Sequence, residues 1–189
     1  MPEDSVYGVW PKSGEIDIVE SRGNSPKNYS GARDTASSAL HWGLDFNTDK
    51  FLQTTNKHYL RRSDYSEGFH TFGLEWSENY LYTYIDNRLL RVLDVGFGGR
   101  NMWTRSGLAK QGYSQVQPTF FSERINELTV VHRDEDPWSQ TGRENTPFDQ
   151  SFYLILNVAV GGTGGYFLYV HFLFDIWPYM RFLCLLSVQ

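Results

Sequence analysis

Short stretches in which polar and apolar residues alternate recur along this chain, with turn-forming residues between them. This period of two is typical of β-strands that bury one face. The stretches run over residues 14–21, 38–42, 69–76, 80–85 and 89–95. Asp86-Asn87 predicts a tight turn, so the last three stretches form a β-meander. We therefore expect an all-β protein, either a sandwich or a barrel.

A continuous apolar run at residues 152–158 differs from these stretches because it offers no polar face. Such a run predicts a strand that is buried on both sides. Loops rich in Gly, Asn, Ser, Asp and Pro separate the strands, over residues 22–33, 96–112 and 138–150. The pattern predicts no amphipathic helix of ordinary length before Pro118.

Two segments depart from this pattern. Residues 114–136 carry apolar groups inside what is otherwise a Gly- and Pro-rich loop, and we interpret them as an atypical insertion. Residues 168–189 form a divergent apolar tail, either a buried strand or sequence foreign to the domain. Charged residues and a proline interrupt this tail, so we expect no membrane span, which needs about twenty predominantly apolar residues. One domain then covers residues 1–167.

Composition narrows the classes of function. The chain of 189 residues is 16% aromatic, which suits pleated strands and also the stacking of rings on sugars. A net charge of −5 argues against nucleic-acid binding, which normally requires a basic stripe. The single cysteine, Cys184, excludes an internal disulfide, and the polar start at residues 1–4 is not a signal peptide. A neutral polysaccharide is compatible with each of these properties.

The first predicted strand carries three carboxylates, Glu15, Asp17 and Glu20. On a regular strand Glu15 and Asp17 share one face and Glu20 points to the other, because side chains repeat every second residue. One extra residue around Ile18-Val19, a β-bulge, would return Glu20 to the shared face. Mutual repulsion would then raise the pKa of at least one carboxyl group. Hydrolysis of a glycoside by two carboxylates needs such a difference, between an ionised nucleophile and a protonated acid.

Other interpretations of these residues stay open at this point. The carboxylate spacing also fits a solvated acidic edge strand or a site for a divalent cation. Trp10 and Trp42 are candidate platforms for stacking on sugars, and the alternative for each is a place in the core. His41 either hydrogen-bonds to the carboxylates or is a structural histidine. The Cys and His spacing predicts no zinc site, and the leading interpretation assigns no metal ligand.

Five blocks, in order along the chain, resemble glycoside hydrolase family 16, in particular its laminarinase-like and β-1,3-glucan-recognition branch. The blocks are residues 10–24 (WPKSGEIDIVESRGN), 40–43 (LHWG), 69–76 (FHTFGLEW), 96–103 (GFGGRNMW) and 147–162 (PFDQSFYLILNVAVGG). The likeness covers most of the chain from Asp4 to Phe167. It implies an antiparallel β-jelly-roll sandwich of the concanavalin A-like kind, with glucan in the cleft of the concave sheet. We expect this sandwich to be incomplete at both ends.

The resemblance also implies roles for residues at matching positions. Glu15 would be the nucleophile, Asp17 its assisting carboxylate and Glu20 the general acid/base. The candidate substrate-binding residues are Trp10, His41, Trp42 and Asn157. Catalysis in the family needs no cofactor; a structural calcium ion is known there, and no ligand for it is assigned in this sequence. We expect a monomer that acts on a β-glucan polysaccharide and whose full-length form is extracellular.

The leading hypothesis is hydrolysis of internal β-1,3 or mixed β-1,3/1,4 glucan linkages, with retention through a glycosyl-enzyme intermediate. Two alternatives stay beside it. One is a protein that binds β-1,3-glucan without cleaving it, although the presence of both Glu15 and Glu20 favours an enzyme. The other is a chain without function, because a jelly roll that lacks strands exposes apolar faces and unpaired backbone groups.

Overall fold

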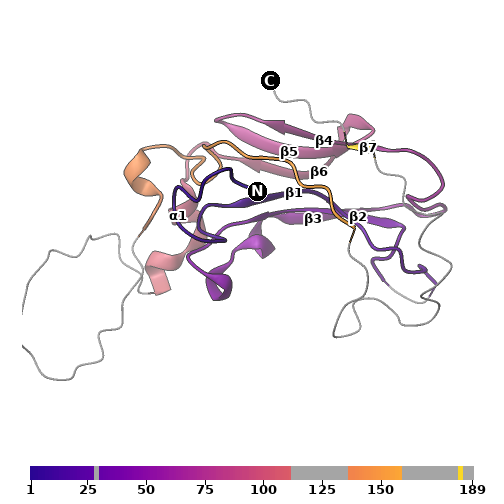
Figure 1. Cartoon of the computed structure of the whole chain (residues 1–189), viewed down its shortest axis with the longest axis horizontal. Helices are drawn as coiled ribbons and strands as arrows, with labels where there is room; N and C mark the ends of the chain where they lie inside the picture. Colours follow the sequence, from indigo (N-terminus) through magenta and orange to yellow (C-terminus); the bar gives the residue numbers. More distant parts are fainter. Residues whose placement is uncertain (28–29, 112–135, 159–182, 185–189) are drawn as a thin grey trace, which may run out of the picture.

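Two β-sheets face each other in the described part of the molecule (Figure 1). The computed structural model describes residues 1–27, 30–111, 136–158 and 183–184, the last pair by backbone alone. The strands are β1 (Glu15–Glu20), β2 (Thr35–His41), β3 (Thr55–Tyr59), β4 (Thr71–Trp76), β5 (Tyr80–Ile85), β6 (Asn87–Gly96) and β7 (Leu183–Cys184). One sheet has the order β1-β2-β3 and the other the order β6-β5-β4-β7.

Neighbouring strands pair antiparallel, except for a two-residue parallel pairing of β4 with β7. The prediction of an antiparallel sandwich of the jelly-roll kind is therefore confirmed. The meander β4-β5-β6 lies where the alternation placed it, with Asp86 in the left-handed region at the tight turn, at φ 58°. Strand β3, Thr-Asn-Lys-His-Tyr, was not predicted, because its mostly exposed residues show no apolar alternation.

Helical segments are short and lie in the connections. They are η1 (Phe46–Thr48), η2 (Phe51–Gln53), α1 (Met102–Ser106), η3 (Leu108–Gln111) and η4 (Ser139–Thr141). The stretch 96–112, expected as a loop, thus contains α1 and η3. Asn101 accepts a 2.9 Å hydrogen bond from the backbone N of Thr104 and caps α1, while Gly107 ends it at φ 69°.

The main core fills the space between the sheets and continues under the loops at one end. Leu40 of β2, Leu81 of β5 and Val95 of β6 are at most 4% exposed and belong to one apolar cluster. At the loop end, Trp138 contacts the rings of Trp42 and Trp103, with centroids 6.0 and 6.2 Å away. These contacts fix the connections relative to the sheets, because a close-packed interior tolerates little displacement.

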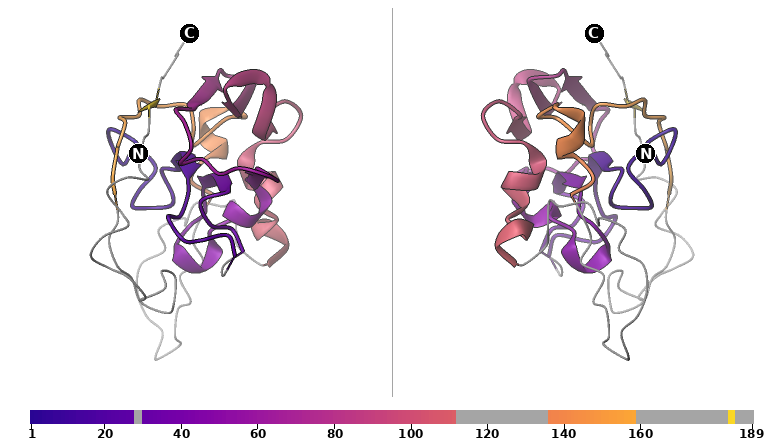
Figure 2. Two further views of the ribbon diagram at one scale, coloured as in Figure 1. Left: turned by 90° about the vertical axis from the view of Figure 1, so that its right-hand side faces the viewer. Right: turned by 90° about the vertical axis from the view of Figure 1, so that its left-hand side faces the viewer.

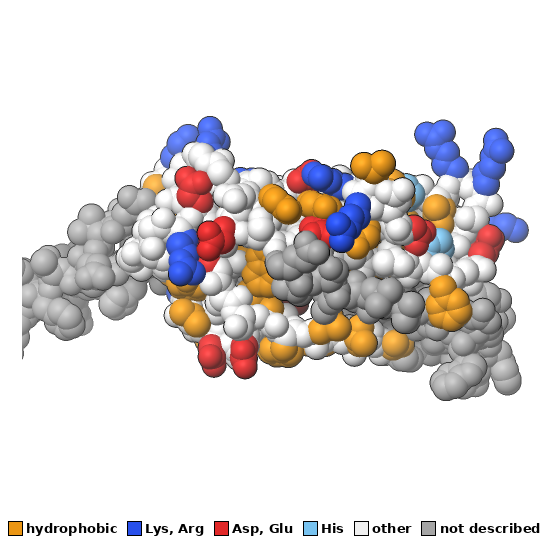
Figure 3. Space-filling view, turned by 90° about the horizontal axis from the view of Figure 1, so that it is seen from above, with side chains coloured by type: hydrophobic (Ala, Val, Ile, Leu, Met, Phe, Trp, Pro, Cys, Tyr) orange, Lys and Arg blue, Asp and Glu red, His pale blue; other side chains and the backbone are white. Residues whose placement is uncertain are grey.

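The outer face of the β4-β5-β6 sheet carries basic, acidic and apolar side chains interspersed (Figure 3). Tyr82 and Tyr84 point outward yet are only 9% and 8% exposed. The guanidinium of Arg91 lies 4.0 Å from the centroid of the Tyr82 ring. The Tyr84 ring lies across Gly73, where an added Cβ would come within 2.1 Å of it. A side chain in place of Gly73 would therefore displace this ring.

Residues 152–158 do not form the buried strand that their apolar run predicts, and this prediction is wrong. Phe152 forms one isolated bridge with Pro2, and the backbone N of Tyr153 donates to the carbonyl of Met1 at 2.9 Å. This brings the segment beside the chain start (Figures 1 and 2). Beyond the bridge the side chains are exposed, because the segment borders a cavity and not a packed sheet. An apolar run gives no information about which neighbours are present to cover it.

Most of the two atypical segments lies outside the described residues. Of 114–136 only Asp136 is described, and of 168–189 only the backbone of β7. The domain limits and the insertion therefore stay predictions. Among the described residues, no helix combines the length and apolar character needed to cross a membrane.

Strand β1 contains the predicted bulge. Glu15 pairs with His41 and Asp17 with Ala39, but Glu20 pairs with Ser37. From Asp17 to Glu20, β1 thus advances three residues while β2 advances two. The extra residue lies at Ile18-Val19, and it shifts the parity of the strand by one. The prediction of a bulge at this place is confirmed.

A buried hydroxyl on β2 accompanies the bulge. Ser38, 1% exposed, donates a 2.7 Å hydrogen bond from its Oγ to the carbonyl of Ile18. In turn, Thr83 Oγ1 on β5 donates to Ser38 Oγ at 2.8 Å. Because a bulge interrupts the ladder, its carbonyl needs such a partner when it is shielded from water. Ser38 therefore links the bulge to the opposite sheet.

Replacing Ser38 by Ala should lower the free energy of unfolding by about 1–3 kcal/mol, because it removes the hydroxyl from two buried hydrogen bonds. Urea denaturation measures this loss. Ser37→Ala is the matched control, since the Ser37 hydroxyl makes only an exposed 3.4 Å bond to the Glu20 carbonyl. Equal stability of the two variants would show that the bulge does not depend on Ser38.

Candidate active site

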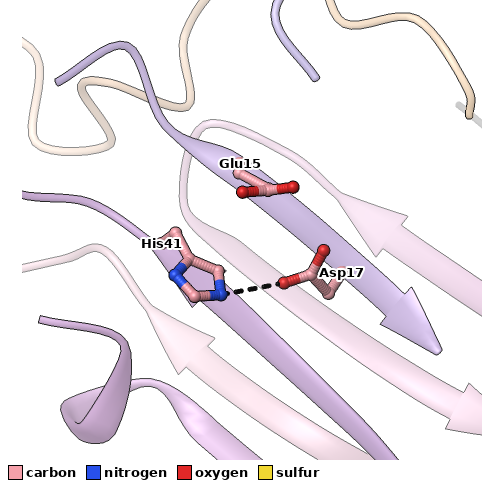
Figure 4. Close-up of side chains that lie close together, drawn as sticks. All are labelled: Glu15, Asp17 and His41. Atoms are coloured by element: carbon pink, nitrogen blue, oxygen red, sulfur yellow. Dashed lines mark ion pairs between the residues drawn. The ribbon is translucent and has the colours of Figure 1, made fainter. Parts of the chain in front are cut away.

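Three side chains meet where β1 runs beside β2. Glu15 and Asp17 come from β1, and His41 comes from the β2 residue that pairs with Glu15 (Figure 4). One ligand atom from each lies within 4.8 Å of the others. His41 Nε2 and Asp17 Oδ2 are 3.2 Å apart and form an ion pair. The expectation that His41 contacts the carboxylate cluster is therefore met.

His41 is held from behind by Asp49, which follows η1. Asp49 Oδ2 accepts a 2.6 Å hydrogen bond from His41 Nδ1. Its other oxygen accepts from the backbone N–H groups of Trp42 and Phe51, at 3.2 and 3.1 Å. The Phe51 ring stacks on the imidazole at a centroid distance of 5.0 Å. These contacts fix the orientation of the ring and aim Nε2 at Asp17.

The charge of His41 follows from these two carboxylates. Burial alone would lower the pKa of the imidazole, but the hydrogen bonds to Asp17 and Asp49 outweigh it and raise the pKa to about 9. His41 is therefore an imidazolium at neutral pH. It lies between two carboxylates, those of Asp17 and Asp49.

Glu20 stays on the solvent side of β1 and does not turn into the core. Desolvation by neighbouring atoms, followed by the negative charge of Asp17 and a smaller contribution from Glu15, raises the pKa of Glu20 above its ordinary value. The positive charge of His41 acts in the opposite direction. The bulge thus leaves Glu20 within the electrostatic field of the other two carboxylates.

Trp10 lies beside the same cluster. Its Nε1 donates a 2.6 Å hydrogen bond to Glu15 Oε2, and its ring centroid is 5.7 Å from that of His41. The ring remains 37% exposed, so it offers surface to a ligand next to Glu15. This placement is compatible with the predicted stacking role.

Trp42 occupies a different environment, and its prediction as a sugar-stacking residue is wrong. Its side chain is 0% exposed in the main core, and its Nε1 donates to Thr54 Oγ1 at 2.8 Å. Trp42 directly follows His41, so its side chain points to the opposite side of the chain, into the space between the sheets. The alternative of a core position is confirmed.

A cavity of about 810 Å³ runs along β1 between this strand, β4 and residues 152–158. Glu15 and Asp17 contribute to its lining, together with Ile16, Ile18 and Leu74. The predicted substrate-binding residue Asn157 is exposed and lies in the same wall. The cavity thus brings Asn157 into one space with two of the carboxylates.

The donor set does not fit a structural calcium ion. Ca²⁺ takes six to eight oxygen ligands, whereas this group offers two carboxylates and an imidazole nitrogen that is already engaged by Asp17. Within residues 1–27, 30–111 and 136–158, Glu15, Asp17 and His41 are the one cluster with metal-ligand spacing. We assign no metal to it.

Sequence reasoning missed two residues of this site. Asp49 lies eight residues after His41 in an irregular connection, and no periodicity points to its contact with the imidazole. Phe46, whose ring centroid is 6.2 Å from that of Trp10, is in η1. The motif Asp45-x-x-Thr48, which caps η1, is the sequence feature that indicates a fixed turn at this place.

Wild-type protein should lose on the order of 2 kcal/mol of unfolding free energy as the pH rises from 6.5 to about 9. A group whose pKa is raised in the folded state stabilises that state fully below the pKa of the unfolded chain. This stability is lost as the pH rises through the pKa of the folded state. Urea denaturation at several pH values tests this, and His41→Gln should remove most of the slope. His58→Gln is the control, since that ring bonds to the Tyr65 hydroxyl and not to a carboxylate. A slope that survives in His41→Gln would contradict the assignment.

Several known proteins resemble most of the length of this chain. A relative from Penaeus monodon named "Beta-1,3-glucan-binding protein" is 34% identical over 167 residues, which cover 88% of this chain and 38% of that protein. A "Glucan endo-1,3-beta-glucosidase" from Cryptopygus antarcticus is 30% identical over 86% of this chain and 43% of its own length. "Glucan endo-1,3-beta-glucosidase A1" from Niallia circulans is 26% identical over 86% of this chain and 17% of its own length. The chain therefore spans less than half of each of these relatives.

No solved structure gives a significant match to the chain. The family model described as "Glycosyl hydrolases family 16" matches residues 4–100, which include β1 with its bulge, β2 and the meander. This match covers half of the chain, and the relatives extend the likeness beyond it. The chain belongs to glycosyl hydrolases family 16.

Proposed function

We propose that the protein hydrolyses internal β-1,3 or mixed β-1,3/1,4 linkages of a glucan, with retention at the anomeric carbon. The observation that carries the proposal is the bulge in β1, which returns Glu20 to the face of Glu15 and Asp17. The three carboxylates lie in different environments. Glu15 is hydrogen-bonded to Trp10, Asp17 is paired with His41, and the pKa of Glu20 is raised. Such a difference in environment suits glycoside hydrolysis, in which one carboxyl group is an ionised nucleophile and another is a protonated acid.

In the first step, Glu15 attacks the anomeric carbon and forms a glycosyl-enzyme ester. Glu20, which holds its proton to higher pH than an ordinary glutamic acid, protonates the leaving glycosidic oxygen. The C1–O bond breaks as the Glu15–C1 bond forms. The Trp10 N–H bond to Oε2 orients the Glu15 carboxylate for this attack.

In the second step, Glu20 is a carboxylate and removes a proton from water, which attacks the same carbon and releases Glu15. Asp17 stays paired with the imidazolium of His41 throughout. Its negative charge favours the return of the proton to Glu20, because repulsion between the carboxylates opposes two neighbouring anions. Asp17 is thus proposed as the residue that keeps the two glutamates in different protonation states.

The β-1,3 linkage is proposed from the names of the relatives. Two of them are named as glucan endo-1,3-β-glucosidases and one as a β-1,3-glucan-binding protein. The exposed ring of Trp10 and the polar Asn157 at the cavity wall are the groups proposed to hold the sugar chain.

Glu15→Gln should reduce release of reducing sugar from laminarin by on the order of a thousandfold or more, because the amide is not a nucleophile. Binding of laminarin in an affinity gel should change by no more than about threefold. Glu78→Gln, at an exposed position after β4, is the matched control and should keep full activity. With wild-type protein, NMR should detect the β-anomer of the product first. Undiminished hydrolysis by Glu15→Gln would refute this nucleophile.

Glu20→Gln should lower the hydrolysis of laminarin by roughly 10²–10⁴-fold, because the leaving oxygen then receives no proton. A dinitrophenyl glycoside of a β-1,3-oligosaccharide needs no such proton, so the rate of its first step should fall far less. The alkaline limb of the wild-type profile of kcat/KM against pH should lie above the pKa of an ordinary glutamic acid and should disappear in this variant. A profile that is unchanged in Glu20→Gln would assign the acid role elsewhere.

Binding of β-1,3-glucan without turnover is the second candidate. It is supported by the Penaeus monodon relative, whose name describes a binding protein and which is 34% identical. The two candidates differ in one measurement. A binder would be retarded in a laminarin gel and release no reducing sugar, whereas the proposed enzyme would be retarded and would release reducing sugar.

A further inference from the structure

We infer that Phe46 and Trp10 together form a two-ring platform that selects a curved β-1,3-glucan chain over a straight β-1,4 chain. This inference rests on the proposed function and names the feature of the substrate that the site recognises. Phe46 is 78% exposed, although it is a large apolar side chain. Its ring centroid lies 6.2 Å from that of Trp10, and the planes of the rings differ by 42°.

The backbone around Phe46 is held in place by hydrogen bonds. Asp45 Oδ1 accepts from the backbone N–H groups of Asn47 and Thr48, at 2.8 and 2.9 Å. Thr48 Oγ1 accepts from the backbone N–H groups of Leu44 and Asp45, at 2.9 Å each. Such a reciprocal cap fixes the turn, so Phe46 is presented at a defined position without being packed in the core. Rigid presentation lowers the entropy lost when a ligand binds.

The platform is connected directly to the carboxylates. Trp10 Nε1 is 2.6 Å from Glu15 Oε2, so a sugar on the Trp10 ring is next to the sugar that faces Glu15. Trp10 has two neighbouring rings, His41 at 5.7 Å and Phe46 at 6.2 Å between centroids. On a bound chain we therefore assign Phe46 to a sugar adjacent to the one on Trp10.

The tilt between the rings carries the selectivity. In a β-1,4 chain the two linkages of each glucose lie opposite each other across the ring, so the chain is a flat ribbon. In a β-1,3 chain the linkages are at C1 and C3, so the chain bends and the faces of successive sugars turn. Two rings at 42° do not both lie flat on a ribbon, whereas they follow sugars whose faces turn. Aromatic faces bind sugars through their apolar area, so this match of planes decides how much area is buried.

The test is the dissociation constant for β-1,3-gluco-oligosaccharides, measured by calorimetry in the hydrolysis-deficient Glu15→Gln background so that the ligand is not consumed. Phe46→Ala should weaken binding of a β-1,3-hexasaccharide on the order of tenfold, because one apolar contact face is lost. Phe46→Trp should restore or improve it. Binding of a β-1,4-hexasaccharide should change by less than twofold in either variant. Phe69→Ala is the matched control, since Phe69 is another exposed phenylalanine, 66% exposed and placed before β4.

Two results would overturn the inference. One is equal affinity of Phe46→Ala and the background protein for the β-1,3-hexasaccharide. The other is an equal loss of affinity for both linkages, which would show that Phe46 contacts sugar without discrimination. In either case, wild-type protein that cleaves laminarin would leave the proposed function standing. If protein with Phe46 and Glu15 intact neither binds nor cleaves laminarin, the proposed function itself fails, and the platform fails with it.

Discussion

The hydrogen bond from Ser38 to the carbonyl of Ile18 is the constraint on which the site depends. A bulge costs ladder hydrogen bonds, and a regular β1 would satisfy its backbone better but would direct Glu20 to the opposite face. The hydroxyl of Ser38 compensates for the lost partner, and Thr83 of the facing sheet satisfies that hydroxyl in turn. The position of Glu20, the proposed general acid/base, is thus set by contacts in the interior of the sandwich, on the side away from the proposed substrate.

The charges in the site depend on three groups in contact with one another in a row, Asp49, His41 and Asp17. Asp49 is nearly buried, at 7% side-chain exposure, and two backbone N–H groups bind it. An anion held in this way makes the imidazolium of His41 favourable at neutral pH. The imidazolium lies 3.2 Å from Asp17 and opposes part of the rise in the pKa of Glu20 that the negative charge of Asp17 causes.

Much of the fold and part of the site could be predicted from the sequence. Alternation located β1, β2 and the meander, because each buries one face, and the parity of Glu20 pointed to the bulge. Strand β3 was missed because it is an edge strand of polar residues, and residues 152–158 were misjudged because apolar content alone does not reveal neighbours. The partners Asp49 and Ser38 depend on loop geometry and on the facing sheet, which the local pattern does not describe.

The two tryptophans near the carboxylates show why residue type alone does not identify a sugar-binding ring. Trp42 is joined to His41 in the chain, and the alternation of β2 then requires that one of the two faces the cleft and the other the core. Trp10 precedes β1 in an irregular segment, so no strand parity directs it inward, and its N–H finds Glu15 as a partner. Because its N–H is bound to the carboxylate of Glu15 and not to a core residue, the Trp10 ring is both oriented and exposed. This argument extends to Phe46, since η1 holds its backbone while no buried neighbour is required to hold its ring.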